Sequence, residues 1–166
     1  MFRLKMGIIV AIILTVIMII TKLHRGVIKW VGVLFFSYAF VAVVLRDNMW
    51  AVKYMGVLAN GALAVGTWAG IVLKKPFTLE YAREHTDPSL WSSPSFLRTS
   101  YLLSMIWAVI FSINTGLAWQ KSVHPTLYSW VYEAISYTLL VAAMFVSTWY
   151  PKYVRQKRES ASSGQI

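Results

Sequence analysis

Four polar residues interrupt otherwise apolar stretches of this chain and are the first candidates for chemistry. They are Lys53, Asn60, Asn114 and Glu133. A charged side chain is costly inside a bilayer, so such residues usually pair with one another or line an ion pathway. Counted along the helices predicted below, Lys53, Asn114 and Glu133 lie at a similar depth. The sequence therefore predicts a Lys53–Glu133 ion pair with Asn114 completing its hydrogen bonds.

Such a polar cluster has two interpretations, and the sequence leaves both open. As a functional site it would carry protons or ions. As a structural feature it would fix the register of neighbouring helices, with Asn60, near mid-depth, forming a hydrogen bond between helices. We favour the structural interpretation, because a carrier usually needs more polarity at the membrane midplane than Asn60 alone supplies.

A second group of titratable residues lies within eight positions of one another. It consists of Glu80, Arg83, Glu84, His85 and Asp87. Carboxylates beside an imidazole can serve general acid–base chemistry, here at a lipid headgroup. Helical neighbours of opposite charge are also typical of a solvated surface, and we favour that interpretation.

Metal and cofactor chemistry find little support in the sequence. The chain has no cysteine, and His24, His85 and His124 fall in predicted connections rather than inside apolar stretches. No spacing typical of zinc or haem ligands, phosphate loops or dinucleotide sites occurs. The sequence predicts no metal, no cofactor and no enzymatic activity.

Composition places the chain in a membrane. Of its 166 residues, 58% are hydrophobic and 13% are charged, and the mean hydropathy is +0.59. The formal net charge of +10 would suggest nucleic acid as the partner of a soluble protein. Here the basic residues flank apolar stretches, as the positive-inside rule requires, so we expect no nucleic-acid partner.

The elements that must position these residues are helices, and the predicted fold class is an all-α polytopic membrane protein. Five transmembrane helices are expected, at residues 6–21, 26–45, 49–73, 100–119 and 127–150. The third has 25 residues, enough to cross a hydrocarbon core of about 30 Å. A four-span chain, in which residues 6–21 lie along the interface, is the alternative.

Local signals define the ends of these helices. Ser93 before Pro94 predicts a capped helix start, and Pro151 predicts the end of the fifth span ahead of a basic, mobile tail at 151–166. The hydrophilic connection at 74–99 contains a stretch, residues 77–84, that predicts a short amphipathic helix. In the third span, small residues recur every fourth position and predict a helix-packing face. They are Ala62, Gly66 and Gly70.

The basic residues also predict an orientation. With five spans, five of the sixteen lysines and arginines fall on the side of the N-terminus and eleven on the other. This asymmetry predicts that the N-terminus lies outside and that the 74–99 connection and the C-terminus are cytoplasmic. The cations expected to face lipid headgroups are Lys74, Lys75, Lys152, Arg155, Lys157 and Arg158.

Several short sequence elements follow one another along the chain in an order that is characteristic. An apolar span carries Trp68 and ends at Lys74-Lys75-Pro76; a connection with Trp91 follows, then Trp-Ala-Val-Ile-Phe at 107–111 and Gly-Leu-Ala at 116–118. Over residues 45–153 this order resembles the small bacterial inner-membrane family called intracellular septation protein A. The resemblance implies a non-enzymatic envelope protein that supports division or wall synthesis through other membrane proteins.

The predicted function is thus that of an interaction or scaffold component of the bacterial cytoplasmic membrane. Its expected partners are the lipid bilayer and other membrane proteins, and self-association stays open. One alternative is a small carrier or channel that uses Lys53, Asn60 and Glu133. A second is a lipid-headgroup enzyme that uses the carboxylates of the connection together with His85.

Overall fold

The computed structural model describes residues 6–7, 9–13, 27–84, 86–124 and 129–163, and every element within them is a helix. The all-α prediction is confirmed for this part of the chain. In order, the elements are α2 (Val27–Ala39), the π-helix η1 (Phe40–Leu45), α3 (Met49–Lys53), α4 (Met55–Val72), α5 (Phe77–Glu84), the 3₁₀-helix η2 (Pro88–Leu90), α6 (Pro94–Val123) and α7 (Ser129–Ser163).

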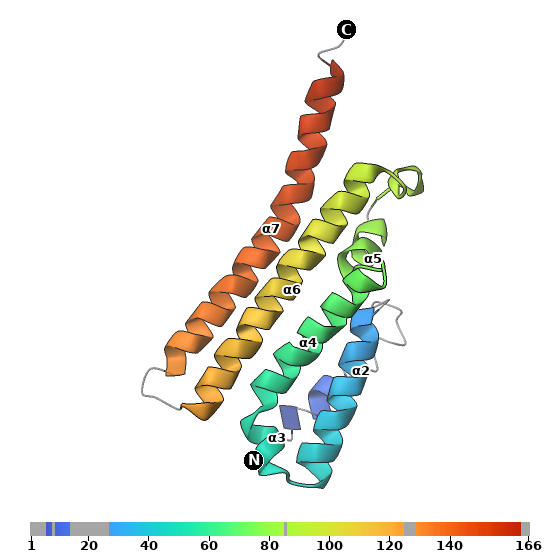
Figure 1. Ribbon diagram of the computed structural model, residues 1–166. Coiled ribbons are helices and arrows are strands. Elements are labelled where there is room, and N and C mark those ends of the chain that lie inside the picture. The colour runs from blue at the N-terminus through green and yellow to red at the C-terminus, as the bar shows by residue number, and fades with distance from the viewer. Residues whose placement is uncertain (1–5, 8, 14–26, 85, 125–128, 164–166) are drawn as a thin grey trace.

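Four helices lie side by side in the order α2, α4, α6, α7 (Figure 1). Helix α6 packs between α4 and α7, and α2 covers the other side of α4. Helix α5 folds back against the beginning of α6, and α7 continues well past that end of the bundle. The 74–99 connection therefore lies on the bundle end instead of forming a separate unit.

Three helices are long and apolar enough to cross a membrane. They are Met55–Val72, Pro94–Val123 and Ser129–Lys157, which correspond to the predicted spans at 49–73, 100–119 and 127–150. A shorter apolar helix, Lys29–Leu45, falls within the predicted span at 26–45. Of the predicted span at 6–21, residues 14–21 lie outside the described part of the chain. The structure thus supports three spans, not the full set of five.

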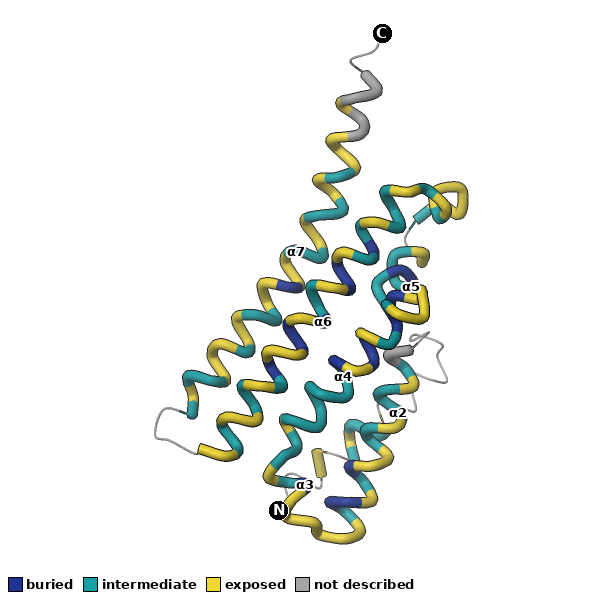
Figure 2. The backbone as a smooth tube through the Cα atoms, in the orientation of Figure 1, coloured by how far each residue is buried: buried dark blue, intermediate teal, exposed yellow. Residues whose placement is uncertain are grey.

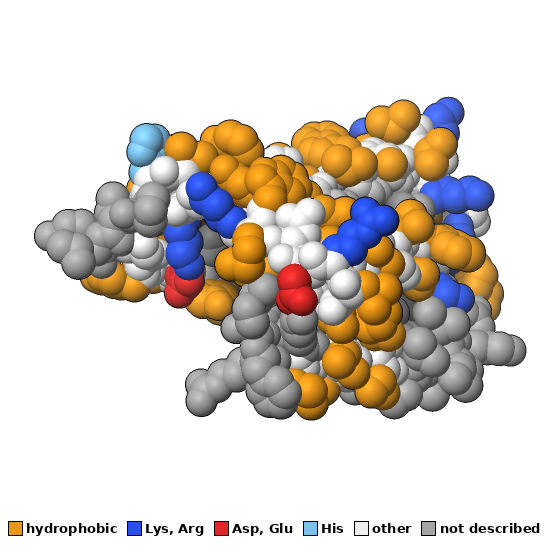
Figure 3. Space-filling model, turned by 90° about the horizontal axis from the view of Figure 1, so that it is seen from below, with side chains coloured by type: hydrophobic (Ala, Val, Ile, Leu, Met, Phe, Trp, Pro, Cys, Tyr) orange, Lys and Arg blue, Asp and Glu red, His pale blue; other side chains and the backbone are white. Residues whose placement is uncertain are grey.

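The outer surface of these helices is apolar. Leu34, Val65 and Val141 are each about two-thirds or more exposed, and hydrophobic side chains dominate the view from the α3 end of the bundle (Figure 3). Several hydroxyl groups within the spans donate to carbonyls of their own helices, as when Thr138 Oγ1 donates to the Ala134 carbonyl at 2.7 Å. This pattern suits lipid, which offers no hydrogen-bond partner to a side chain.

A polar turn joins η1 to α3. Asp47 adopts a left-handed conformation with φ of 47°, which aspartate tolerates better than most residues. Asn48 then caps α3, because its Oδ1 accepts hydrogen bonds from the backbone N–H groups of Trp50 at 3.0 Å and Ala51 at 3.2 Å. The chain reverses here within three residues.

The end of α4 is a second tight reversal. Lys74 has φ of 57°, its N–H donates to the Ile71 carbonyl at 3.1 Å, and the N–H of Lys75 donates to the Gly70 carbonyl at 2.8 Å. This pair of bonds is a Schellman motif, which satisfies carbonyls that the helix end leaves free. Pro76 follows and is fully buried, so the chain turns directly into α5.

The predicted small-residue face of α4 packs inside the bundle. Gly66 and Gly70 are buried, and Ala62 is half-buried. A Cβ added at Gly66 would overlap Val31 Cγ2 of α2, and one added at Gly70 would lie 3.0 Å from the Lys75 carbonyl oxygen. The small-residue face of α4 therefore packs against α2 and against the chain reversal, so residues of this chain already cover it.

Helix α6 begins where the sequence predicts a capped start. The Ser93 Oγ accepts a hydrogen bond from the Phe96 N–H at 3.3 Å, and Pro94 is the first helical residue. The helix runs to Val123, several residues past the predicted end of the fourth span at 119. Helix α6 thus extends beyond the predicted span at both of its ends.

The prediction that Pro151 ends the last span is wrong. Helix α7 continues through Pro151 to Ser163, so the expected tail is helical over most of its length. Proline has no N–H to donate to the Ser147 carbonyl, but its fixed φ is compatible with a helix. The Trp149 and Tyr153 rings stack across this point, with centroids 5.3 Å apart, and link the turns before and after it.

Replacing Gly66 with alanine should weaken the packing of α2 on α4. The new methyl group meets the short, β-branched Val31 side chain, which has little rotamer freedom to move aside. We expect Gly66→Ala to lower the free energy of unfolding by about 1–3 kcal/mol, measured by thermal or denaturant unfolding in detergent.

Gly116→Ala is the matched control for this prediction. Gly116 is also helical, and a Cβ there would meet no atom of the described residues within 4 Å. Alanine is intrinsically better than glycine in a helix, so this variant should be neutral or more stable. Equal destabilisation of both variants would contradict the proposed close contact.

Candidate functional site

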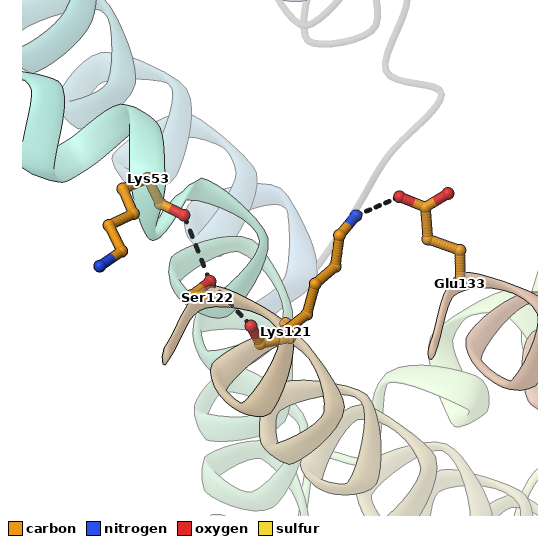
Figure 4. A network of polar contacts seen from close by, with 5 residues as sticks. Lys53, Lys121, Ser122 and Glu133 are labelled. Carbon is orange, nitrogen blue, oxygen red and sulfur yellow. Dashed lines mark hydrogen bonds and ion pairs between the residues drawn. The ribbon is translucent and has the colours of Figure 1, made fainter. Parts of the chain in front are cut away.

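The predicted Lys53–Glu133 ion pair does not form. Glu133, near the start of α7, pairs with Lys121 in the last turn of α6. The Lys53 ammonium lies 5.2 Å from the centre of the Tyr54 ring, and Figure 4 shows it pointing away from Glu133. Only the Lys53 backbone joins this network, where its carbonyl accepts a hydrogen bond from Ser122 Oγ at 3.3 Å.

The register of the α6–α7 hairpin explains the change of partner. Antiparallel helices that follow each other closely in the chain place residues at equal distances from their junction opposite one another, and Lys121 and Glu133 meet this condition. The Trp107–Ser147 hydrogen bond, at 2.9 Å, continues the same register further along the two helices. The side chains of Lys121 and Glu133 are 38% and 52% exposed, so we expect their attraction to contribute little stability.

Asn114 does not join the other predicted polar residues. It lies seven residues before Lys121 on α6, which puts it about 10 Å deeper along the helix. Its side chain is buried, with 1% exposed, and neither its Oδ1 nor its Nδ2 has a hydrogen-bond partner among the described residues. A buried amide without partners costs free energy in an apolar interior.

Asn60 forms its hydrogen bond within its own helix. Its Nδ2 donates to the Gly56 carbonyl at 2.9 Å, so the expected hydrogen bond from Asn60 to a neighbouring helix is wrong. The four predicted residues therefore do not converge. Lys53 and Glu133 lie at one end of the bundle with separate partners, while Asn60 and Asn114 lie inside the spans.

Two tryptophans link the long helices instead. The indole N–H of Trp68, on α4, donates to Ser112 Oγ of α6 at 3.2 Å. The indole N–H of Trp107, on α6, donates to Ser147 Oγ of α7 at 2.9 Å. The Trp107 ring also meets Phe77 of α5 edge-on, with centroids 6.5 Å apart. Trp107 therefore contacts side chains from α5 and α7 as well as from its own helix.

Helix α5, with the bounds that the sequence predicts, is fastened to α6 by hydroxyl groups. Thr78 Oγ1 donates to the Ser100 carbonyl at 2.5 Å and lies 2.7 Å from Ser104 Oγ. The Thr78 N–H donates to the same Ser104 oxygen at 3.4 Å. Leu79 is buried beside this contact. The amphipathic helix thus packs on α6 through the hydrogen bonds of Thr78 and the burial of Leu79.

The carboxylates of α5 occupy different environments. Glu80 is half-buried, and its Oε2 has no hydrogen-bond partner among the described residues, whereas Glu84 is exposed. Burial raises the pKa of Glu80 above its ordinary value, and the positive charges of Arg83 and Lys75 oppose this shift. His85, the third residue of the hypothetical acid–base site, lies outside the described residues.

The predicted headgroup-facing cations are exposed wherever their side chains are described. Lys74 and Lys75 lie at the α4 reversal, and Lys152, Arg155 and Lys157 lie on the last turns of α7. The side chain of Arg158 is outside the described part. Arg83 of α5 lies over the Trp91 ring, with its guanidinium carbon 5.4 Å from the ring centre.

One surface feature was missed in the sequence. Ala134, Thr138 and Ala142 recur every fourth residue on α7, and all three are exposed. Their spacing is the same as that of the small-residue face of α4, so the α7 face could have been predicted from the sequence in the same way. Periodicity alone does not indicate which of the two faces is covered by other helices. How the helices pack determines this.

Comparisons of this chain with family models, with curated proteins and with solved structures find no match. Among the described residues, no group of three histidine, aspartate or glutamate side chains lies close enough together to hold a metal ion. The resemblance to intracellular septation protein A therefore rests on the sequence features alone.

Replacing Asn114 with leucine should stabilise the protein. The variant removes two buried polar atoms that have no partner among the described residues, and it keeps a side chain of similar size. We expect the free energy of unfolding to rise by about 1–3 kcal/mol, measured by denaturant unfolding in detergent. Asn60→Leu is the control, since it removes a hydrogen bond that the amide makes to Gly56 and should not stabilise. A loss of stability in Asn114→Leu would show that its amide has a partner.

Glu80 should make stability depend on pH. Because its pKa is raised in the folded protein, the protonated form favours folding. Its contribution is fully present below the ordinary value of 4.5 and is lost as pH rises through the folded-state pKa. Glu80→Gln should therefore have a higher melting temperature than the wild type at neutral pH and a similar one at acidic pH.

The exposed Glu84 provides the matched control for the pH experiment. Glu84→Gln removes the same charge from the same helix without removing a buried carboxylate. Its difference in melting temperature from the wild type should change less with pH than that of Glu80→Gln. Indistinguishable pH profiles for the two variants would rule out a special role for Glu80.

Proposed function

We propose that this chain is a non-enzymatic integral membrane protein of the bacterial cell envelope that acts by binding other membrane proteins. The observation that carries this proposal is the exposed small-residue face of α7. Helices associate in lipid chiefly by close packing of small residues and by hydrogen bonds between helices, because lipid removes the hydrophobic driving force. A small-residue face open to the bilayer is therefore a suitable contact for another transmembrane helix.

Helix α7 is the least covered of the three long helices. In its apolar stretch 6% of the residues are buried, compared with 33% in α6 and 22% in α4. It packs against α6, and the tube in Figure 2 is mostly exposed along its outer side. The equivalent face of α4 is filled by Val31 and by the chain reversal. Thus the small-residue face of α7 is exposed, whereas that of α4 is covered inside the bundle.

The carrier alternative receives less support from the arrangement of the polar residues. A transport site needs polar groups that converge near the middle of the membrane. Glu133 instead pairs with Lys121 near the adjoining ends of α6 and α7, and Asn60 bonds to its own helix. Asn114 is the one residue of the predicted set whose buried amide has no partner among the described residues.

The order of apolar spans, the Lys74-Lys75-Pro76 reversal and the tryptophan positions support a more specific role. These features resemble intracellular septation protein A and suggest a function in septation or envelope synthesis at the cytoplasmic membrane. In this proposal the C-terminus is cytoplasmic and the N-terminus lies outside, as the distribution of basic residues favours.

Site-specific photo-crosslinking tests the proposed binding face. The chain has no cysteine, so a single introduced cysteine can carry a benzophenone label without competing sites. Thr138→Cys places the label on the α7 face, and Val65→Cys, on an outward-facing position of α4 that is 71% exposed, is the control. We expect a discrete adduct with another membrane protein from position 138 and only lipid adducts from position 65.

Bulky substitutions on the same face should remove that adduct. Ala134→Leu and Ala142→Leu fill the surface that a partner helix would approach, and both positions are exposed, so folding should be unaffected. Val65→Leu should leave the adduct in place. If position 138 yields only lipid adducts, or only an adduct between two copies of this chain, the proposed binding of other membrane proteins is wrong.

A further inference from the structure

Exposed lysines from two separate segments lie at the end of the bundle where α6 begins. Lys74 and Lys75 form the reversal after α4, and Lys152 lies on the part of α7 that passes this end. All three side chains are exposed. They are far apart in sequence, so their relation depends on the register of the helices.

The helix contacts place the three lysines at one level. Extending the register set by the Trp107–Ser147 and Lys121–Glu133 contacts puts Lys152 opposite Leu102 of α6. The Lys74–Lys75 reversal is followed by Thr78, which bonds to Ser100 and Ser104 on the same part of α6. Together the three lysines form a cationic layer around the end of the bundle.

Tryptophans place this layer relative to the bilayer. On the exposed side of α7, Trp130 and Trp149 are nineteen residues apart, or about 28 Å along the helix. This separation is close to the thickness of a hydrocarbon core, and tryptophans gather at its two boundaries. Lys152 follows Trp149 by three residues, about 5 Å further out. The cationic layer therefore lies at the depth of the lipid phosphates.

The charge balance differs at the opposite end. There the acidic Glu133 pairs with Lys121, and the Lys53 ammonium lies over the Tyr54 ring. In the view from that end, acidic and basic side chains both appear (Figure 3). Near the cationic layer, α5 carries Glu80 and Glu84 together with Arg83, and Glu80 interacts electrostatically with Arg83 and Lys75. The layer thus keeps excess positive charge.

We propose that Lys74, Lys75 and Lys152 bind the phosphate groups of anionic phospholipids in the leaflet at this end of the bundle. Lysines are suited to this role, because a flexible stem carries a compact charge with three donors. In a helix the Cα–Cβ bond tilts toward the N-terminus, so the Lys152 side chain starts in the direction of the bilayer. The anionic lipids would then be the preferred neighbours of the protein.

Lipid selectivity in reconstituted vesicles tests this inference. The full-length protein is placed in phosphatidylcholine vesicles that contain a minority of phosphatidylglycerol. The relative association constants of spin-labelled phosphatidylglycerol and phosphatidylcholine are then measured by electron paramagnetic resonance. The neutralised variant combines Lys74→Asn, Lys75→Gln and Lys152→Gln; asparagine is chosen at 74 because it tolerates the φ of 57° there.

A single cation near an anionic surface contributes about fivefold to lipid association, so the neutralised variant should lose at least about fivefold in its preference for phosphatidylglycerol. The triple Lys→Arg variant at the same positions keeps the charge and should keep the preference. The control variant combines Arg46→Gln, Lys53→Gln and Lys121→Gln at the opposite end, with the same change in net charge, and should also retain it.

Three results would overturn the inference. These are equal association constants for the two lipids in the wild type, an unchanged preference in the neutralised variant, and a loss of preference in the control variant as large as that in the neutralised one. The last result would assign the preference to net charge instead of the cationic layer. None of these measurements depends on whether α7 binds another protein, so this inference and the proposed scaffold function can fail separately.

Discussion

The structure depends on one constraint, which is that lipid offers no hydrogen bonds to the groups it surrounds. A polar group in a span is therefore most stable with a partner inside the protein, and the Asn114 amide is an exception among the described residues. The indoles of Trp68 and Trp107 donate to serine hydroxyls on the next helix, so they satisfy this need and connect α4 to α6 and α6 to α7. The threonine hydroxyls meet the same need with carbonyls of their own helices.

Features set by local chemistry could be predicted from the sequence. The Ser93–Pro94 start of α6 and the bounds of α5 each depend on a few adjacent residues, and the structure confirms them. Pro151 is an exception, because the cost of one missing hydrogen bond does not by itself end a long helix. Local signals thus located most helix starts, but not the end of α7.

The candidate site depended on distant contacts and was harder to predict. The depth of Glu133 was estimated from the expected span limits, but α6 extends beyond residue 119 and brings Lys121 opposite Glu133. A small shift along a helix therefore changes the partner of a charged side chain. Similarly, spacing identifies a small-residue face, whereas the helix arrangement decides that Gly66 is covered and Thr138 is open.

Helix α7 combines two kinds of surface at different depths. Its exposed small residues lie between Trp130 and Trp149, within the apolar part of the helix, and Lys152 lies beyond Trp149. A second helix bound at Thr138 would displace acyl chains, but it would reach the phosphate level beside Lys152 only if it ran along the whole of α7. Because these surfaces are separated along the helix axis, a protein partner and anionic lipids can occupy α7 together. An acidic group on the partner at the level of Lys152 would instead compete with the lipids.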